Sequence, residues 1–122
     1  MTKILVVEDI PLNMEFLLEI LKLQGFDVDG AKDGEEAIQK AEKGIYDLII
    51  MDIALPGIDG FEAFKIIKSM PSYKIVPVIA LTAYAMTGDR ERILKAGFDA
   101  YASKPLDVPA FLKILEKYKG KV

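Results

Sequence analysis

Short apolar runs alternate with longer amphipathic segments along the chain. The short runs predict five strands, at residues 3–7, 27–31, 48–51, 76–81 and 100–103. The segments between them predict crossover helices, so the pattern is typical of a parallel α/β sheet. Three of the runs are almost continuous in Val, Ile and Leu, as expected of central strands covered on both faces. Residues 27–31 are more polar and include Gly30, so we expect that strand at an edge.

Five helices are predicted from apolar spacing and from start and stop signals. They cover about residues 11–24, 34–43, 60–70 and 87–95, and the last follows a predicted N-cap at Asp107. The buried face of the first helix is predicted to consist of Leu12, Phe16, Ile20 and Leu23. The fourth has only Ile93 and Leu94 as apolar anchors, so we expect it to be loosely held.

Composition limits the classes of function. The 122 residues, 52% of them apolar, predict one domain over residues 1–122 with no output domain. The 16 basic and 19 acidic residues are mixed, so no basic stripe predicts nucleic-acid binding. The absence of cysteine and histidine excludes a thiolate or imidazole metal site and a Ser-His triad. No signal-peptide core or membrane span of roughly 18 apolar residues is found, so we expect a cytoplasmic protein with no membrane partner.

Polar residues gather at the carboxyl ends of the predicted strands. Glu8 and Asp9 follow the first strand, Asp52 the third, Thr82 the fourth and Lys104 the fifth. These ends meet at one edge of a parallel sheet, where ligands bind. Each residue alone has a simpler interpretation, such as a helix cap for Asp9 or a surface charge for Lys104. Three carboxylates at one edge repel one another, however, and an all-oxygen set with a compensating cation suits Mg²⁺.

The chain resembles response regulator receiver domains over residues 3–119. The resemblance rests on the motifs Ile4-Leu5-Val6-Val7-Glu8-Asp9, Met51-Asp52-Ile53, Leu55-Pro56-Gly57-Ile58-Asp59-Gly60, Leu81-Thr82-Ala83 and Lys104-Pro105. It implies a flavodoxin-like fold, a doubly wound five-stranded parallel sheet of order 2-1-3-4-5 with five helices. It also implies a role in a two-component system or phosphorelay, similar to cell-cycle single-domain regulators and receivers of hybrid kinases.

The same resemblance assigns roles to residues. Asp52 is implied to be the phosphoacceptor. Mg²⁺ would be bound by Glu8, Asp9, Asp52 and the backbone carbonyl of Ala54. Thr82 would follow the phosphoryl oxygens, Lys104 would pair with them, and Tyr101 would act with Thr82 as an aromatic switch. The Lys104-Pro105 bond would be cis.

The resemblance further implies partners. A histidine kinase or histidine phosphotransfer protein would donate the phosphoryl group, and a downstream protein would bind the face of the fourth helix, fifth strand and fifth helix. No enzymatic activity is expected beyond the protein's own phosphorylation and dephosphorylation. We expect a monomer, and dimerisation on activation is left open. The alternative function is a degenerate receiver that acts as a phosphate-independent scaffold. It is disfavoured because Asp52, Thr82 and Lys104 are all present.

Overall fold

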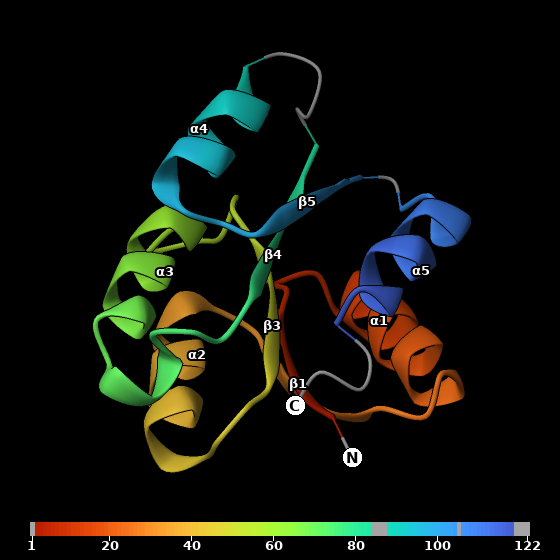
Figure 1. Ribbon diagram of the computed structural model, residues 1–122, viewed down its shortest axis with the longest axis horizontal. Coiled ribbons are helices and arrows are strands. Elements are labelled where there is room, and N and C mark those ends of the chain that lie inside the picture. The colour runs from red at the N-terminus through yellow and green to blue at the C-terminus, as the bar shows by residue number, and fades with distance from the viewer. Residues whose placement is uncertain (1, 84–87, 105, 119–122) are drawn as a thin grey trace.

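The computed structural model describes residues 2–83, 88–104 and 106–118. Figure 1 shows a twisted sheet with helices on both faces. Its strands are β1 (Lys3–Val7), β2 (Asp27–Ala31), β3 (Leu48–Asp52), β4 (Val78–Thr82) and β5 (Ala100–Ser103). They lie in the order β2-β1-β3-β4-β5, and every neighbouring pair is parallel. The predicted fold class and strand order are therefore confirmed, with the polar strand β2 at an edge.

The helices divide into two layers (Figure 1). They are α1 (Pro11–Leu23), α2 (Gly34–Lys43), α3 (Gly60–Lys68), α4 (Asp89–Ala96) and α5 (Val108–Glu116), with a short 3₁₀ helix, η1 (Pro71–Tyr73), before β4. Alternate residues of β1 enter different cores: Leu5 and Val7 join the side of α2 and α3, whereas Ile4 and Val6 join the side of α1 and α5. The central strands are thus buried on both faces, as their continuous apolar sequences predict.

Two strand boundaries differ from the prediction in a way that matters for the site. β3 and β4 each extend one residue further, so that Asp52 and Thr82 are the last residues of their strands. β4 also begins at Val78 and not at residue 76, because Pro77 has no N–H to donate to the sheet. The Val78 N–H donates instead to Asp99 Oδ2 at 2.8 Å. Because Asp52 and Thr82 are themselves strand residues, the pairing of the strands fixes their backbone.

The predicted buried face of α1 is wrong. Leu17 and Leu21 are buried, and Met14 and Leu18 pack beside them. The predicted set is largely exposed, at Leu12 (74%), Phe16 (49%) and Leu23 (79%). Both sets have the spacing of a helical face, and α1 carries apolar residues on more than one side. Periodicity alone therefore does not identify the side that faces the sheet.

The fourth helix is anchored even less than its sequence suggests. Ile93 is fully buried, but Leu94, the other predicted anchor, is 47% exposed. The helix begins at Asp89, two residues after the predicted start, and residue 87 lies outside the described part of the chain. Its N-cap, Gly88, has a φ of 104° and offers no side chain to the first turn. Contacts other than apolar packing must therefore contribute to holding α4.

Gly60, at the start of α3, permits a close approach behind the candidate acceptor. A Cβ at this position would clash with the Asp52 carbonyl oxygen and with Ile53 Cα. The Gly60 N–H donates to the Ile53 carbonyl at 3.1 Å, and Asp59 caps the helix by accepting the Glu62 N–H at 2.9 Å. The loop that follows Asp52 is thereby held against the end of β3.

Candidate functional site

Three acidic side chains meet at the carboxyl edge of the sheet. Glu8 and Asp9 follow β1, and Asp52 ends β3, the neighbouring strand. One carboxylate oxygen from each lies within 4.8 Å of the others. Glu8 and Asp52 are 1% and 2% exposed, whereas Asp9 is half-buried. The structure therefore brings together all three carboxylates that the sequence pattern groups at this edge.

Both carboxylate oxygens of Asp52 accept hydrogen bonds. The Ala54 N–H donates to Oδ1 at 2.9 Å, and Lys104 Nζ donates to Oδ2 at 2.5 Å. The first bond comes from the loop behind the strand and the second from the end of β5. Each bond restrains one oxygen of the carboxylate. Together they fix the orientation of the Asp52 side chain before any ligand binds.

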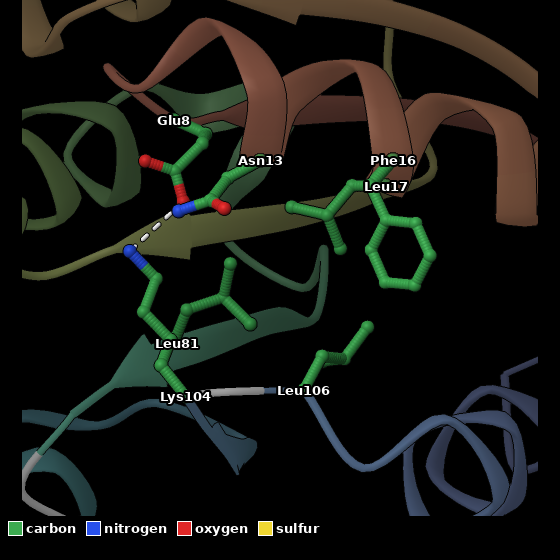
Figure 2. Close-up of a pocket in the computed structure, with 7 residues that line it drawn as sticks. All are labelled: Glu8, Asn13, Phe16, Leu17, Leu81, Lys104 and Leu106. Atoms are coloured by element: carbon green, nitrogen blue, oxygen red, sulfur yellow. Dashed lines mark ion pairs between the residues drawn. The ribbon is translucent and has the colours of Figure 1, made fainter.

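Glu8 is held less completely. Its Oε2 accepts the Ile10 N–H at 3.2 Å, and its Oε1 lies 2.9 Å from Lys104 Nζ (Figure 2). The second contact is an ion pair, and Oε1 has no hydrogen-bond partner among the described residues. Burial raises the pKa of Glu8, and the charge of Asp52 adds to the increase. The contacts with Lys104 and Ile10 act against this increase.

Lys104 is the cation of the site. Burial acts to lower the pKa of its ammonium, but the hydrogen bond to Asp52 and the ion pair with Glu8 outweigh burial and raise it. Its backbone N–H also donates to the Thr82 carbonyl at 2.8 Å, which fixes the lysine beside β4. When all four groups are ionised, three carboxylates and one ammonium leave a net charge of −2. The cluster remains short of positive charge.

These residues fit a hard divalent cation. The ligand atoms that they offer are carboxylate oxygens, the type that Mg²⁺ prefers. A buried oxygen, Glu8 Oε1, accepts no hydrogen bond from any residue that the structure describes, and Asp9 is only half-buried. Ala54, whose carbonyl is predicted as a further ligand, is exposed beside the site. Its metal-binding role stays a prediction.

A cavity of about 230 Å³ reaches the site from the side of α1 (Figure 2). Glu8 and Lys104 lie at its polar end, next to Asn13. Its apolar wall consists of Phe16, Leu17, Leu81 and Leu106. The acidic cluster is therefore approached over an apolar surface that includes the half-exposed ring of Phe16.

The two predicted switch residues lie on neighbouring strands. Thr82 is 1% exposed at the end of β4, and Tyr101 is half-buried on β5 with the Arg90 guanidinium 5.9 Å from its ring centroid. The Thr82 hydroxyl donates to Asp89 Oδ2 at 2.9 Å. Nothing in the sequence singles out Asp89, because an acidic residue in the first turn of a helix is ordinary. The predicted cis bond involves Pro105, which lies outside the described residues.

Among the helices that the structure describes, none has the length and apolar character needed to cross a lipid bilayer.

Comparisons with known proteins agree with this geometry. The family model for the response regulator receiver domain matches residues 4–116. The polar-differentiation response regulator DivK of Brucella ovis is 41% identical over 121 residues, which are 98% of each chain. The receiver domain of the sensor histidine kinase PA1611 from Pseudomonas aeruginosa PAO1 is 39% identical, with a TM-score of 0.88 over 96% of each chain. That structure has a magnesium ion coordinated in its active-site cleft.

A further solved structure, the chemotaxis protein CheY4 of Vibrio cholerae, is 30% identical. It superposes with a TM-score of 0.90 and covers 97% of this chain and 98% of its own. The matched segment of the family model extends from β1 to the end of α5 and includes every residue of the acidic cluster. The chain therefore belongs to the response regulator receiver domain family.

Proposed function

We propose that this protein accepts a phosphoryl group on Asp52 as the receiver of a two-component or phosphorelay pathway. The observation that carries the proposal is the position of Asp52. It is a buried carboxylate at the end of a central strand, bonded to Lys104 and within 4.8 Å of Glu8 and Asp9. A structural aspartate would not need two further carboxylates beside it, since their mutual repulsion is unfavourable.

The chemistry follows from the groups present. A carboxylate oxygen of Asp52 attacks the phosphorus atom, a new O–P bond forms, and the bond to the donor breaks with its electron pair leaving on the donor. The Ala54 N–H holds the other oxygen. Lys104 then pairs with the phosphoryl oxygens in place of the carboxylate oxygen it now contacts. Mg²⁺ bound by Glu8, Asp9, Asp52 and the Ala54 carbonyl would supply positive charge against the phosphoryl oxygens.

The phosphoryl donor has to be external, because the chain contains no histidine. We propose a histidine kinase or a histidine phosphotransfer protein as the donor, in agreement with the relatives named as a response regulator and as a receiver of a sensor histidine kinase. The phosphorylated form would signal to a downstream protein through the α4-β5-α5 face. The only reactions catalysed would be the protein's own phosphorylation and dephosphorylation. The cytoplasmic location stays a prediction from the sequence.

Intact-mass spectrometry after treatment with acetyl phosphate tests the proposal. The unmodified protein should gain one phosphoryl group when Mg²⁺ is present and none when EDTA is added. Asp52→Asn keeps the shape of the side chain but removes the nucleophile, so labelling should disappear. Asp59→Asn is the matched control, because it makes the same change at an exposed residue of the following loop and asparagine still caps α3. Full labelling of Asp52→Asn would overturn the proposal. Failure of the unmodified protein to label with any donor would favour a phosphate-independent scaffold.

A further inference from the structure

The hydroxyl of Thr82 already has a charged acceptor in this structure. It donates to Asp89 Oδ2 at 2.9 Å, across the gap between the end of β4 and the start of α4. Thr82 is 1% exposed, and the Asp89 side chain is 17% exposed. A hydrogen bond to a carboxylate is roughly twice as strong as a neutral one. This contact is therefore a substantial link between the sheet and a helix with little apolar anchoring.

The Asp89 carboxylate is itself held in position. Its second oxygen, Oδ1, lies 3.6 Å from Arg92 Nη1, one helical turn further along α4. The Arg92 guanidinium lies 4.5 Å from the ring centroid of Phe61 on α3. A cavity of about 250 Å³ beside these residues is also lined by Ala54 and Thr82. The carboxylate thus has one oxygen directed to Thr82 and the other to Arg92, next to the phosphoacceptor loop.

The chemistry of a hydroxyl makes this arrangement a competition. Thr82 has one O–H proton and donates it to one acceptor at a time. Carboxylate and phosphoryl oxygens are both acceptors. If Asp52 is phosphorylated and Thr82 turns to the phosphoryl oxygens, the bond to Asp89 has to break. The start of α4 then loses this hydrogen bond to β4.

We propose that Asp89 is a positioning residue that holds Thr82 in the resting arrangement and thereby sets how strongly the phosphorylated state is favoured. The inference rests on the proposed function of Asp52 and adds a residue to it. Asp89 opposes activation because it holds the Thr82 hydroxyl proton that the phosphoryl oxygens would accept. Breaking its bond to Thr82 removes one contact between the first turn of α4 and the end of β4.

Binding of beryllofluoride, a mimic of the acyl phosphate, tests this in excess Mg²⁺. Asp89→Ala removes the competing acceptor, so the affinity for beryllofluoride should rise about tenfold. Asp89→Asn leaves a neutral acceptor, so its effect should have the same sign and be smaller. The matched controls are Glu91→Ala and Glu91→Gln, which remove one negative charge from an exposed residue of the same first turn of α4. They should leave the affinity within about twofold of the unmodified protein.

A double-mutant cycle separates a role through Thr82 from a general effect on the helix. In a Thr82→Val background there is no hydroxyl to hold, so adding Asp89→Ala should no longer raise the affinity. The inference is overturned if Asp89→Ala and Glu91→Ala change the affinity equally, or if the gain from Asp89→Ala persists in Thr82→Val. If the unmodified protein neither binds beryllofluoride nor labels with acetyl phosphate, the proposed function fails and the inference fails with it. Normal labelling with no effect of Asp89 overturns the inference alone.

Discussion

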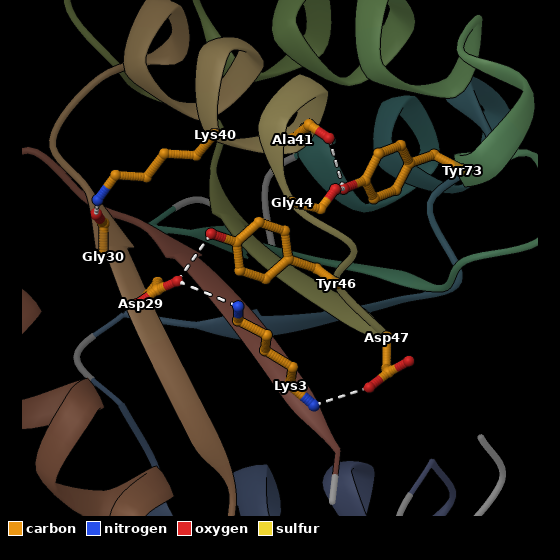
Figure 3. Close-up of polar contacts among 9 residues, drawn as sticks. All are labelled: Lys3, Asp29, Gly30, Lys40, Ala41, Gly44, Tyr46, Asp47 and Tyr73. Atoms are coloured by element: carbon orange, nitrogen blue, oxygen red, sulfur yellow. Dashed lines mark hydrogen bonds and ion pairs between the residues drawn. The ribbon is translucent and has the colours of Figure 1, made fainter.

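The two ends of the sheet use polar groups in opposite ways. At the amino end, the Tyr46 hydroxyl donates to Asp29 Oδ2 at 2.8 Å, and Lys3 Nζ lies 3.9 Å from the same oxygen (Figure 3). The Lys3 backbone N–H donates to Asp47 Oδ2 at 2.8 Å. Nearby, the Tyr73 hydroxyl lies between two backbone carbonyl oxygens, 2.7 Å from that of Ala41 and 2.9 Å from that of Gly44, and shares its one proton between them. Acceptors and donors are matched there.

At the carboxyl end the negative charges are not fully compensated by positive charge. Glu8 and Asp52 share the Lys104 ammonium, and Asp9 lies beside them. A buried oxygen of Glu8 has no hydrogen bond among the described residues. Burying a charge without full compensation lowers stability. A ligand that brings positive charge recovers that free energy on binding. The amino end therefore contributes to stability, and the carboxyl end retains an unfavourable charge balance that a cation can relieve.

The largest test of this comparison is the removal of one hydroxyl at the amino end. Tyr73→Phe leaves the carbonyls of Ala41 and Gly44 without their donor, which stands at 2.7 Å and 2.9 Å. Since Tyr73 is 1% exposed, the free energy of unfolding should fall by about 2 kcal/mol. Urea denaturation measures the change, and labelling of Asp52 by acetyl phosphate should be unaffected. An unchanged free energy of unfolding would mean that the polar contacts at the amino end of the sheet do not contribute to stability.

Much of the fold could be predicted from the sequence, for identifiable reasons. Apolar runs such as residues 48–51 are too hydrophobic to be anything but buried, and the polar run at residues 27–31 indicates an edge. The buried side of α1 could not be predicted, because Leu12 and Phe16 fit a helical face as well as Leu17 and Leu21 do. Which of the two apolar stripes is covered depends on how α1 packs on β1 and β2, and the sequence of α1 alone does not decide this.

The site divides in a similar way. Glu8, Asp9, Asp52 and Lys104 each follow or end a strand, so the topology alone brings them to one edge. Asp89 differs, because its bond to Thr82 depends on how the chain between β4 and α4 is placed. The partners of Tyr73 are backbone carbonyls 32 and 29 residues away, which no local pattern encodes. Contacts of this kind, which depend on tertiary structure and not on strand ends, could therefore not be predicted from the sequence.

A smaller effect of opposite sign is expected at the carboxyl end. Glu8→Gln removes one of the competing buried charges, so the metal-free protein should gain about 1 kcal/mol in its free energy of unfolding. The same variant should reduce the increase in melting temperature that excess Mg²⁺ produces, because a ligand is lost. Thermal melts in EDTA and in Mg²⁺ measure both changes. Asp29→Asn, at the amino end, is the matched control and should lower stability, since it weakens contacts with Tyr46 and Lys3. A loss of stability in Glu8→Gln would contradict the comparison.

The smallest effect is a pH dependence that follows from Glu8. Burial raises the pKa of Glu8 in the folded protein above its ordinary value of 4.5. Between these two pKa values the folded state binds more protons than the unfolded state, so the contribution of Glu8 to the free energy of unfolding falls as pH rises through that window. The raised pKa of Lys104 acts only near and above its ordinary value of 10.5, so it does not affect this window.

Other carboxylates also titrate over this range, so the measurement has to be a difference. Urea denaturation of the metal-free protein and of Glu8→Gln, from about pH 4 to about pH 8, isolates the contribution of one group. The stability advantage of Glu8→Gln should be smallest at the acidic end, where Glu8 is protonated and resembles glutamine. It should grow as pH rises through the folded pKa and then level off. An advantage that does not change with pH would show that charge at Glu8 is not its cause, and the carboxyl end would then have to be explained by packing instead.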